Sequence, residues 1–263
     1  MSDIPSTSLK GLRALVCGAS GGIGAATARA FAAAGADVAI LARSADRLEA
    51  LAAELRAKGA RVDVVVADLQ DRAGLAAAVD ALLAAGSLQI LVNNTGGPKG
   101  GRLLDTAPEA FLEPFERHVL AAHQLVRQLV PGMSEGGYGR IVNIVSTSVY
   151  EPIPNLGVSN TIRAAVAGWA KSLSSELPPG VTINNVLPGF TDTPRLATLG
   201  AARAAREGTD TDAVRAAWVA QVPEGRLARP EETAATIAFL ASPAGAYLRG
   251  QSIAVDGGRL RSI

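Results

Sequence analysis

The sequence contains a single cysteine and almost no net charge. Cys17 is the only cysteine among 263 residues, so an internal disulfide is excluded and no oxidising compartment is implied. Lysine and arginine number 25 and aspartate and glutamate 24, which gives a formal net charge of +1. This balance offers no electrostatic reason to expect nucleic acid or an anionic membrane as a partner. We expect a small-molecule partner and no metal.

Long apolar runs are also missing, and we expect no leader segment. The most apolar stretches, such as Leu12–Cys17 and Ile90–Val92, fall far short of the roughly 18 to 20 residues that cross a bilayer. The N-terminal stretch Met1–Lys10 is polar and contains Pro5, so it lacks the apolar core of a signal peptide. We therefore expect a soluble, cytoplasmic protein that does not contact a membrane.

The chain instead alternates short apolar runs with alanine-rich segments of helical period. Such runs, mostly without polar alternation, are typical of strands buried on both faces. The expected strands are Leu12–Cys17, Asp37–Leu41, Arg61–Val66, Leu88–Val92, Arg140–Val145, Val181–Val186 and Ser252–Val255. The expected helices are Ile23–Ala34, Ala45–Lys58, Gly74–Ala85, about Ala107–Val130, Leu156–Leu177 and Glu231–Ala241. This alternation predicts a single-domain, doubly wound α/β fold, with a seven-stranded parallel sheet flanked by helices on both faces.

One region departs from the alternation. Residues 189 to about 230 are rich in alanine, arginine and glycine and carry one weak helical pattern, near Asp212–Ala220. Long connections inside compact domains often cover binding sites. We predict a substrate lid over about 190–225, with an unrelated surface excursion as the alternative.

A glycine cluster follows the first expected strand and opens the first expected helix. It reads Gly18-Ala19-Ser20-Gly21-Gly22-Ile23-Gly24. Glycine permits a tight turn, lets backbone N–H groups approach a pyrophosphate, and allows the helix to pack closely on the strand. The cluster therefore predicts a dinucleotide site formed by Gly18, Ser20, Gly22, Ile23 and Gly24.

Further motifs, in order from about residue 12 to 258, resemble those of the short-chain dehydrogenase/reductase family, in particular its 3-oxoacyl-ACP-reductase-like members. They are the glycine spacing, Asp68-Leu69, Asn93-Asn94-Thr95-Gly96, Pro188-Gly189 with Thr193, and Val255-Asp256-Gly257-Gly258. The resemblance implies one Rossmann-type NAD(P)-binding domain, an oxidoreductase acting on a carbonyl or alcohol, and a homotetramer or homodimer. It also implies cofactor contacts from Asp68, Leu69, Asn93, Thr95, Gly96, Pro188, Gly189 and Thr193.

The end of the second strand bears on the choice of cofactor. NAD-specific members of the family place a carboxylate here for the ribose hydroxyls, whereas this chain has Leu41-Ala42-Arg43-Ser44. Without the carboxylate a 2′-phosphate is not repelled, and Arg43 can bind it as a fork. We predict that NADP(H) is preferred, with Arg43 and Ser44 at the phosphate and NAD(H) as the alternative.

The resemblance fails at the catalytic positions. Family members carry a helix asparagine, a serine after the fifth strand, and a Tyr-x-x-x-Lys that begins thirteen residues later. Ser146 matches the serine, but Ser159 and Arg163 replace the tyrosine and lysine, and His118 stands at the asparagine position. Ser159 and Arg163 still share one helix face. A serine hydroxyl is, however, a far poorer acid than a phenol, so Arg163 can hold ribose hydroxyls while an obvious general acid is lacking.

Three other residues are candidates for the proton donor. Tyr150 lies in the loop after Ser146, His118 is of a type that titrates near neutrality, and Lys99 lies in the loop after the fourth strand. We expect an NADP(H)-dependent oxidoreductase in which Ser146 polarises the substrate oxygen and an atypical group supplies the proton. The alternatives are a nucleotide-binding pseudoenzyme or sensor without turnover, and a non-redox lyase that resembles halohydrin dehalogenases.

Overall fold

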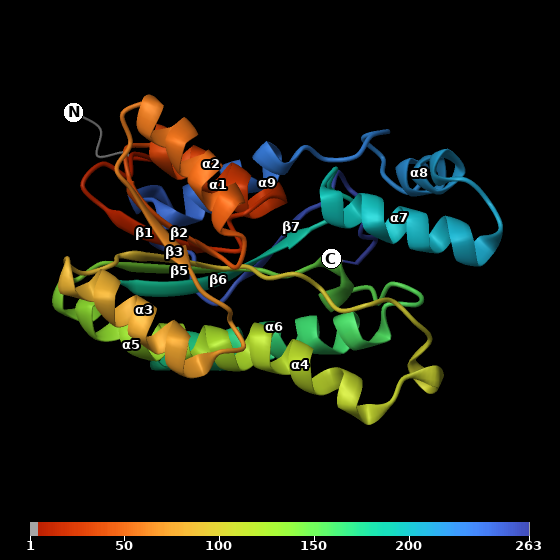
Figure 1. The fold of residues 1–263 in the computed structure, drawn as a ribbon, viewed down its shortest axis with the longest axis horizontal. Helices are drawn as coiled ribbons and strands as arrows, with labels where there is room; N and C mark the ends of the chain where they lie inside the picture. The colour runs from red at the N-terminus through yellow and green to blue at the C-terminus, as the bar shows by residue number, and fades with distance from the viewer. Residues whose placement is uncertain (1–4, 263) are drawn as a thin grey trace.

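Seven parallel strands form the centre of the computed structural model, which describes residues 5–262 (Figure 1). They are β1 Arg13–Cys17, β2 Asp37–Ala42, β3 Val62–Val66, β4 Ile90–Asn93, β5 Gly139–Ile144, β6 Val181–Pro188 and β7 Ser252–Val255. Their order in the sheet is β3-β2-β1-β4-β5-β6-β7, and every neighbouring pair is parallel. The direction of winding reverses between β1 and β4, which confirms the doubly wound sheet predicted from the sequence.

Helices cover both faces of the sheet (Figure 1). One layer contains α1 Gly22–Ala33, α2 Ala45–Ala57 and α9 Pro230–Ala241, and the other contains α3 Arg72–Ala84, α5 Ala121–Glu135 and α6 Gly157–Glu176. The side chains of adjacent β1 residues face opposite helix layers, because side chains alternate along a strand. Val16 packs in the core with Phe31 of α1, and Leu15 packs in the core with Leu125 of α5. A strand whose two faces are both buried in this way is apolar at consecutive positions.

The fourth expected helix is the least regular. Its 3-10 turn η2 Pro108–Phe111 leads into α4 Leu112–Phe115, then into a π-helical turn η3 Glu116–Leu120, and then into α5. Helix α5 passes through Pro131 and ends at Glu135, so the boundary predicted at Val130 is wrong. Short π-helical turns often occur at functional sites, and this one contains His118.

Residues 190–225, the segment predicted to be a lid and called the lid segment below, contain two helices where the sequence predicted one. Helix α7 spans Pro194–Glu207 and α8 spans Thr211–Val219, and both project beyond one end of the sheet (Figure 1). Helix α7 was missed because its composition, mostly alanine and arginine, hides the helical period. Its capping signals were nevertheless present, with Thr193 and Pro194 at the start and Gly208 at the end.

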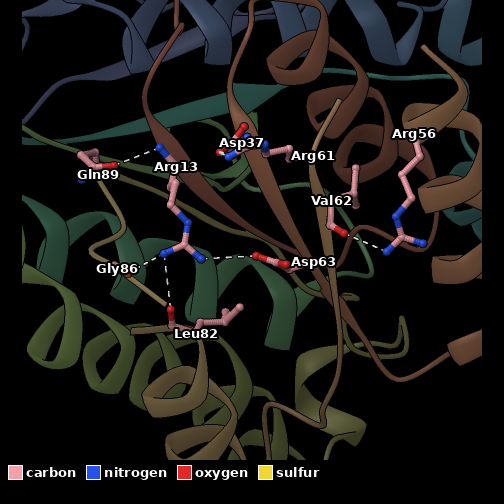
Figure 2. Close-up of polar contacts among 9 residues, drawn as sticks. All are labelled: Arg13, Asp37, Arg56, Arg61, Val62, Asp63, Leu82, Gly86 and Gln89. Carbon is pink, nitrogen blue, oxygen red and sulfur yellow. Dashed lines mark hydrogen bonds and ion pairs between the residues drawn. The ribbon is translucent and has the colours of Figure 1, made fainter. Parts of the chain in front are cut away.

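The amino ends of the strands are held together by polar contacts (Figure 2). The Arg13 guanidinium donates to the carbonyls of Gly86 and Leu82 and lies 3.3 Å from the Asp63 carboxylate. The Arg13 backbone N–H donates to Gln89 Oε1 at 2.9 Å. These contacts join β1 to β3 and to the α3–β4 connection, so charge at this end of the sheet is paired within the protein.

Candidate active site

The glycine cluster forms the turn between β1 and α1, at the carboxyl ends of the strands. A Cβ on Gly24 would lie 2.2 Å from the Gly18 carbonyl oxygen, so only glycine lets α1 pack this closely on the turn. Helix α1 has no side-chain cap and no acidic residue in its first turn. Its first N–H groups therefore remain available to an anion, and this arrangement fits the pyrophosphate of a dinucleotide.

Arg43 lies beside the turn, at the end of β2. Its side chain is 65% exposed, and Nη1 lies 3.7 Å from the Asp68 carboxylate, which follows β3. An exposed ion pair at this distance contributes little, so the guanidinium can turn to a phosphate. Ser44 precedes α2 without bonding its side chain to the helix. The side chains of both residues are therefore available to a ligand, and their binding of a 2′-phosphate stays a prediction.

Thr193 brings the loop after β6 against the glycine cluster. Its hydroxyl accepts a hydrogen bond from the Leu196 N–H at 3.2 Å and so caps α7. A Cβ on Gly22 would lie 3.3 Å from Thr193 Cγ2, which places the lid segment next to the turn. The other residues expected at the cofactor also follow or end strands at this edge: Ser20, Ile23, Leu69, Thr95, Gly96, Pro188 and Gly189.

A row of buried amides supports the loop after β4. The amide nitrogen of Asn93 donates to Asn143 at 2.8 Å, that of Asn143 donates to Asn185 at 2.9 Å, and that of Asn185 donates to Ser252 at 3.0 Å. These residues are direct neighbours in the register of four adjacent strands. The Asn93 side chain is thus engaged within the sheet and positions the Thr95-Gly96 loop. The row was missed, although asparagines inside otherwise apolar runs were its signal.

Ser146 follows β5 and has a hydroxyl hydrogen to offer. Its Oγ accepts a hydrogen bond from the Ser148 N–H at 3.1 Å, and no acceptor for the hydroxyl hydrogen lies among the described residues. Arg163, on α6, donates from Nη1 to the Ile144 carbonyl at 2.7 Å, two residues before Ser146. Ser159 lies one helical turn earlier on α6 and is partly buried, with no side-chain hydrogen bond within the described part of the chain. The structure therefore brings Arg163 to the end of β5, two residues before Ser146, and Ser159 lies one turn from Arg163 on the same helix.

His118 is a structural histidine here. It is only 6% exposed, and its Nε2 lies 3.2 Å from the Gly96 carbonyl, to which the neutral ring can donate. Burial lowers the pKa of His118 well below its ordinary value, and the positive charges of Arg163 and Arg117 lower it further. The expectation that His118 titrates near neutrality is therefore wrong. The ring ties the π-helical turn to the loop after β4.

Tyr150 and Lys99 are placed differently from Ser146. The Tyr150 side chain is half exposed, and its hydroxyl donates to the Ser252 carbonyl of the edge strand β7 at 3.2 Å. Ser252 is level with Asn185, below the carboxyl end of β6, so this bond engages the phenol hydrogen away from the strand ends. Lys99 is exposed in the loop after β4. These positions do not favour Tyr150 or Lys99 as the proton donor.

Two arginines that the sequence analysis did not single out also border this end of the sheet. Arg195, in the first turn of α7, donates to the Pro98 carbonyl. Burial and, to a smaller extent, the charge of Arg195 together lower the pKa of Arg163 to about 10. Arg259 donates to Thr147 Oγ1 at 3.1 Å and covers the Phe190 ring at 4.8 Å. Their partners are distant in sequence, so no local motif marked them.

Metal sites and membrane spans were also sought in the structure. Across residues 5–262, no three side chains of histidine, cysteine, aspartate or glutamate are grouped so that they could hold a metal ion. None of the helices in this range combines the length and apolar character needed to span a bilayer.

Comparisons with known proteins agree with this architecture. The family model described as enoyl-(acyl carrier protein) reductase matches residues 18–259. An oxidoreductase of Mycobacterium tuberculosis is 37% identical over 93% of this chain and 90% of its own length. The 3-oxoacyl-[acyl-carrier-protein] reductase of Vibrio cholerae is 35% identical over 95% of this chain and 98% of its own. The structure of L-sorbose reductase from Gluconobacter frateurii, complexed with NADPH and L-sorbose, has a TM-score of 0.92 at 32% identity and covers 98% of this chain and 99% of its own.

Proposed function

Because this chain belongs to the short-chain dehydrogenase/reductase family, we propose that it is an NADP(H)-dependent oxidoreductase that interconverts a small carbonyl compound and its alcohol. One observation carries the proposal. The uncapped start of α1 and the free hydroxyl hydrogen of Ser146 lie at the same end of the sheet. The first can bind an anionic cofactor and the second can donate to a carbonyl oxygen.

The residues that hold the cofactor surround the glycine cluster. The α1 N–H groups face the pyrophosphate, Arg43 and Ser44 bind the 2′-phosphate, and Arg163 donates to the nicotinamide ribose. The Asn93 amide keeps the Thr95-Gly96 loop in place through its bond to Asn143. When bound, NADP(H) supplies or accepts the hydride.

The chain's own part in the reaction is to stabilise charge and deliver a proton. During reduction the substrate oxygen becomes negative, and Ser146 donates a hydrogen bond to it while the Arg163 guanidinium stabilises the charge. The proton comes from solvent water and passes through the Ser159 hydroxyl, which occupies the position of the family tyrosine. Oxidation of the alcohol follows the same route in reverse. This water relay replaces the donor roles first considered for His118 and Tyr150.

Two finer features belong to the same proposal. The lid segment closes over the substrate, since α7 begins beside the glycine cluster at Thr193. The chain also forms a homotetramer, or alternatively a homodimer, through the faces of α4–α5 and α6 and the C-terminal segment, as its family resemblance implies. The exposed apolar side chains Leu112 and Phe115 on α4 support such an interface. A monomeric mass in light scattering at micromolar concentration would contradict it. No relative named above favours a sensor without turnover or a dehalogenase.

A substrate panel with matched variants tests the proposal. NADPH oxidation is followed at saturating cofactor with ketones, aldehydes, sugars and oxo acids, and at least one is reduced. Ser146→Ala lowers kcat by about 100-fold and leaves the NADPH Kd unchanged, because it removes a donor to the reacting oxygen. Ser172→Ala, which removes an exposed hydroxyl of α6, is the matched control and retains full activity. NADPH binding without turnover on the whole panel would overturn the proposal.

A further inference from the structure

Two guanidinium groups converge on the loop that follows β4. A Cβ on Gly97 would lie 3.3 Å from Arg195 Nη2 and 3.8 Å from Arg163 Nη2. The two arginines come from different elements, α7 and α6, and they flank the same residue. A side chain at position 97 would crowd Arg195 and touch Arg163, so both guanidinium groups border this one residue.

Neither cation has a protein counter-ion in the described chain. Arg163 donates one hydrogen bond, to the Ile144 carbonyl, and Arg195 donates one, to the Pro98 carbonyl. No carboxylate of residues 5–262 forms an ion pair with either guanidinium, whose remaining N–H donors are unused.

Other arginines of the lid segment show that pairing is the local rule. Arg203 of α7 is paired with Glu207 at 2.9 Å, and Arg215 of α8 is paired with Asp192 at 2.9 Å. Two neighbouring positive charges without a counter-ion repel each other, and an anion between them relieves that repulsion. Two adjacent guanidinium groups with unused donors and no counter-ion in the described chain therefore form a place where a ligand anion can bind.

The position of the pair assigns this anion to the substrate. Arg163 is bonded to the strand residue two positions before Ser146, the hydroxyl that faces the carbonyl in the proposed reaction. Arg195 lies on the lid segment, over the loop after β4. The cofactor phosphates have other proposed partners, at the uncapped start of α1 and at the exposed Arg43. A group held by Arg195 and Arg163 would thus be part of the molecule that Ser146 contacts.

We propose that Arg195, together with Arg163, binds a carboxylate of the substrate, and that the preferred substrates are oxo acids and the corresponding hydroxy acids. The inference rests on the proposed reductase function and names its substrate class. Arg195 is its specificity-determining residue, because Arg163 also serves the cofactor ribose and the reacting oxygen.

Matched substrates test the charge alone. kcat/KM is measured for a series of 2-oxo acids and for their primary amides, which keep the shape and lose the charge. The acids are preferred by about tenfold or more, as expected for hydrogen bonds to a charged group. Arg195→Gln removes this preference by raising the KM of the acids, and Arg195→Lys, which keeps the charge, retains part of the preference. The amides and the NADPH Kd are unaffected. Arg203→Gln, which removes a paired charge from the same helix, leaves the preference intact.

A binding measurement keeps this inference separate from the proposed function. Oxamate is titrated into the NADP⁺-loaded protein, and it binds saturably with a Kd that Arg195→Gln raises by about tenfold. If no carbonyl is reduced but this Arg195-dependent binding is found, the reductase proposal fails and the carboxylate site stands. Equal kcat/KM for acids and amides overturns the inference while the reductase stands. A preference for phosphorylated ketones, or an Arg195→Gln effect on NADPH alone, also overturns it.

Discussion

The two ends of the sheet treat arginine in opposite ways. At the amino ends of the strands Arg140 is 3% exposed, donates to the Gly139 and Gly180 carbonyls at 2.8 Å each, and packs its guanidinium 4.1 Å from the Tyr138 ring. At the carboxyl ends Arg163 and Arg195 each make one bond to a carbonyl and have no carboxylate partner in the described chain. Arg140 also has no carboxylate partner in the described chain, but it uses its donors on internal carbonyls, whereas the carboxyl end leaves donors available for ligands.

This difference between the two ends predicts that a substitution at the carboxyl ends of the strands affects mainly NADPH binding. Gly22→Ala should raise the NADPH Kd by about 100-fold or more, equivalent to about 2.7 kcal/mol. The added methyl would lie 3.3 Å from Thr193 and would narrow the space between Thr193 and the glycine turn. Isothermal titration measures the effect. Gly59→Ala, a residue with φ +86° in open surroundings, carries similar backbone strain and is the control, with unchanged NADPH affinity. Equal losses of NADPH affinity in Gly22→Ala and Gly59→Ala would refute this role for the space between Thr193 and the turn.

A change at the amino end should act on stability. Arg140→Leu leaves the buried Gly139 carbonyl without this donor and removes one of the two donors to the Gly180 carbonyl, and we expect the free energy of unfolding in urea to fall by about 2 kcal/mol. Activity per folded molecule should stay constant. Arg61→Leu, at the same end but with its side chain 87% exposed, should change stability by less than about 0.5 kcal/mol. A loss of NADPH affinity in Arg140→Leu would break the division between the two ends.

The adenine side of the site should show a smaller, selective effect. Arg43→Gln should weaken NADPH binding by about tenfold and leave NADH binding unchanged, because only NADPH carries the 2′-phosphate. Fluorescence titration with both dinucleotides separates the two effects. Arg47→Gln, an exposed position on α2, removes the same charge nearby and should leave both affinities unchanged. Parallel losses for NADH and NADPH in Arg43→Gln would count against the phosphate assignment.

An ion pair remote from both ends should have the smallest effect. Hydrogen bonds from Arg29 and then Lys58 lower the pKa of Glu54 to about 2. A carboxylate with a lowered pKa stabilises the fold above its ordinary value near 4.5, and that contribution disappears as the pH falls toward 2. Because these side chains are partly exposed, Arg29→Met should cost less than about 1 kcal/mol at pH 7. Urea unfolding at pH 7 and pH 3 should show the difference from wild type shrinking at the lower pH; a constant difference would exclude the ion pair as its source.

The sequence alone was sufficient for the fold and for the cofactor turn. Strand positions follow from apolar runs, as the prediction of Leu12–Cys17 and the observed strand Arg13–Cys17 illustrate, because burial on both faces demands apolar residues at consecutive positions. The turn from Gly18 to Gly24 is likewise a local property, since its backbone geometry depends on residues that adjoin one another. Helix α7 escaped prediction because alanine and arginine form helices without marking a buried face.

The chemistry of the remaining side chains was decided by contacts between distant segments. His118 lost its expected titration because folding buries it against Gly96 and near Arg163, and desolvation disfavours its charged form. Tyr150 donates to a carbonyl of β7 that no local pattern connects with it. The sequence by itself determined the parallel sheet and the dinucleotide turn, which rest on local periodicity and backbone freedom. Only the tertiary structure brought Arg163 and Arg195 together at Gly97, because the interaction between two charges depends on their distance and on their exposure to solvent.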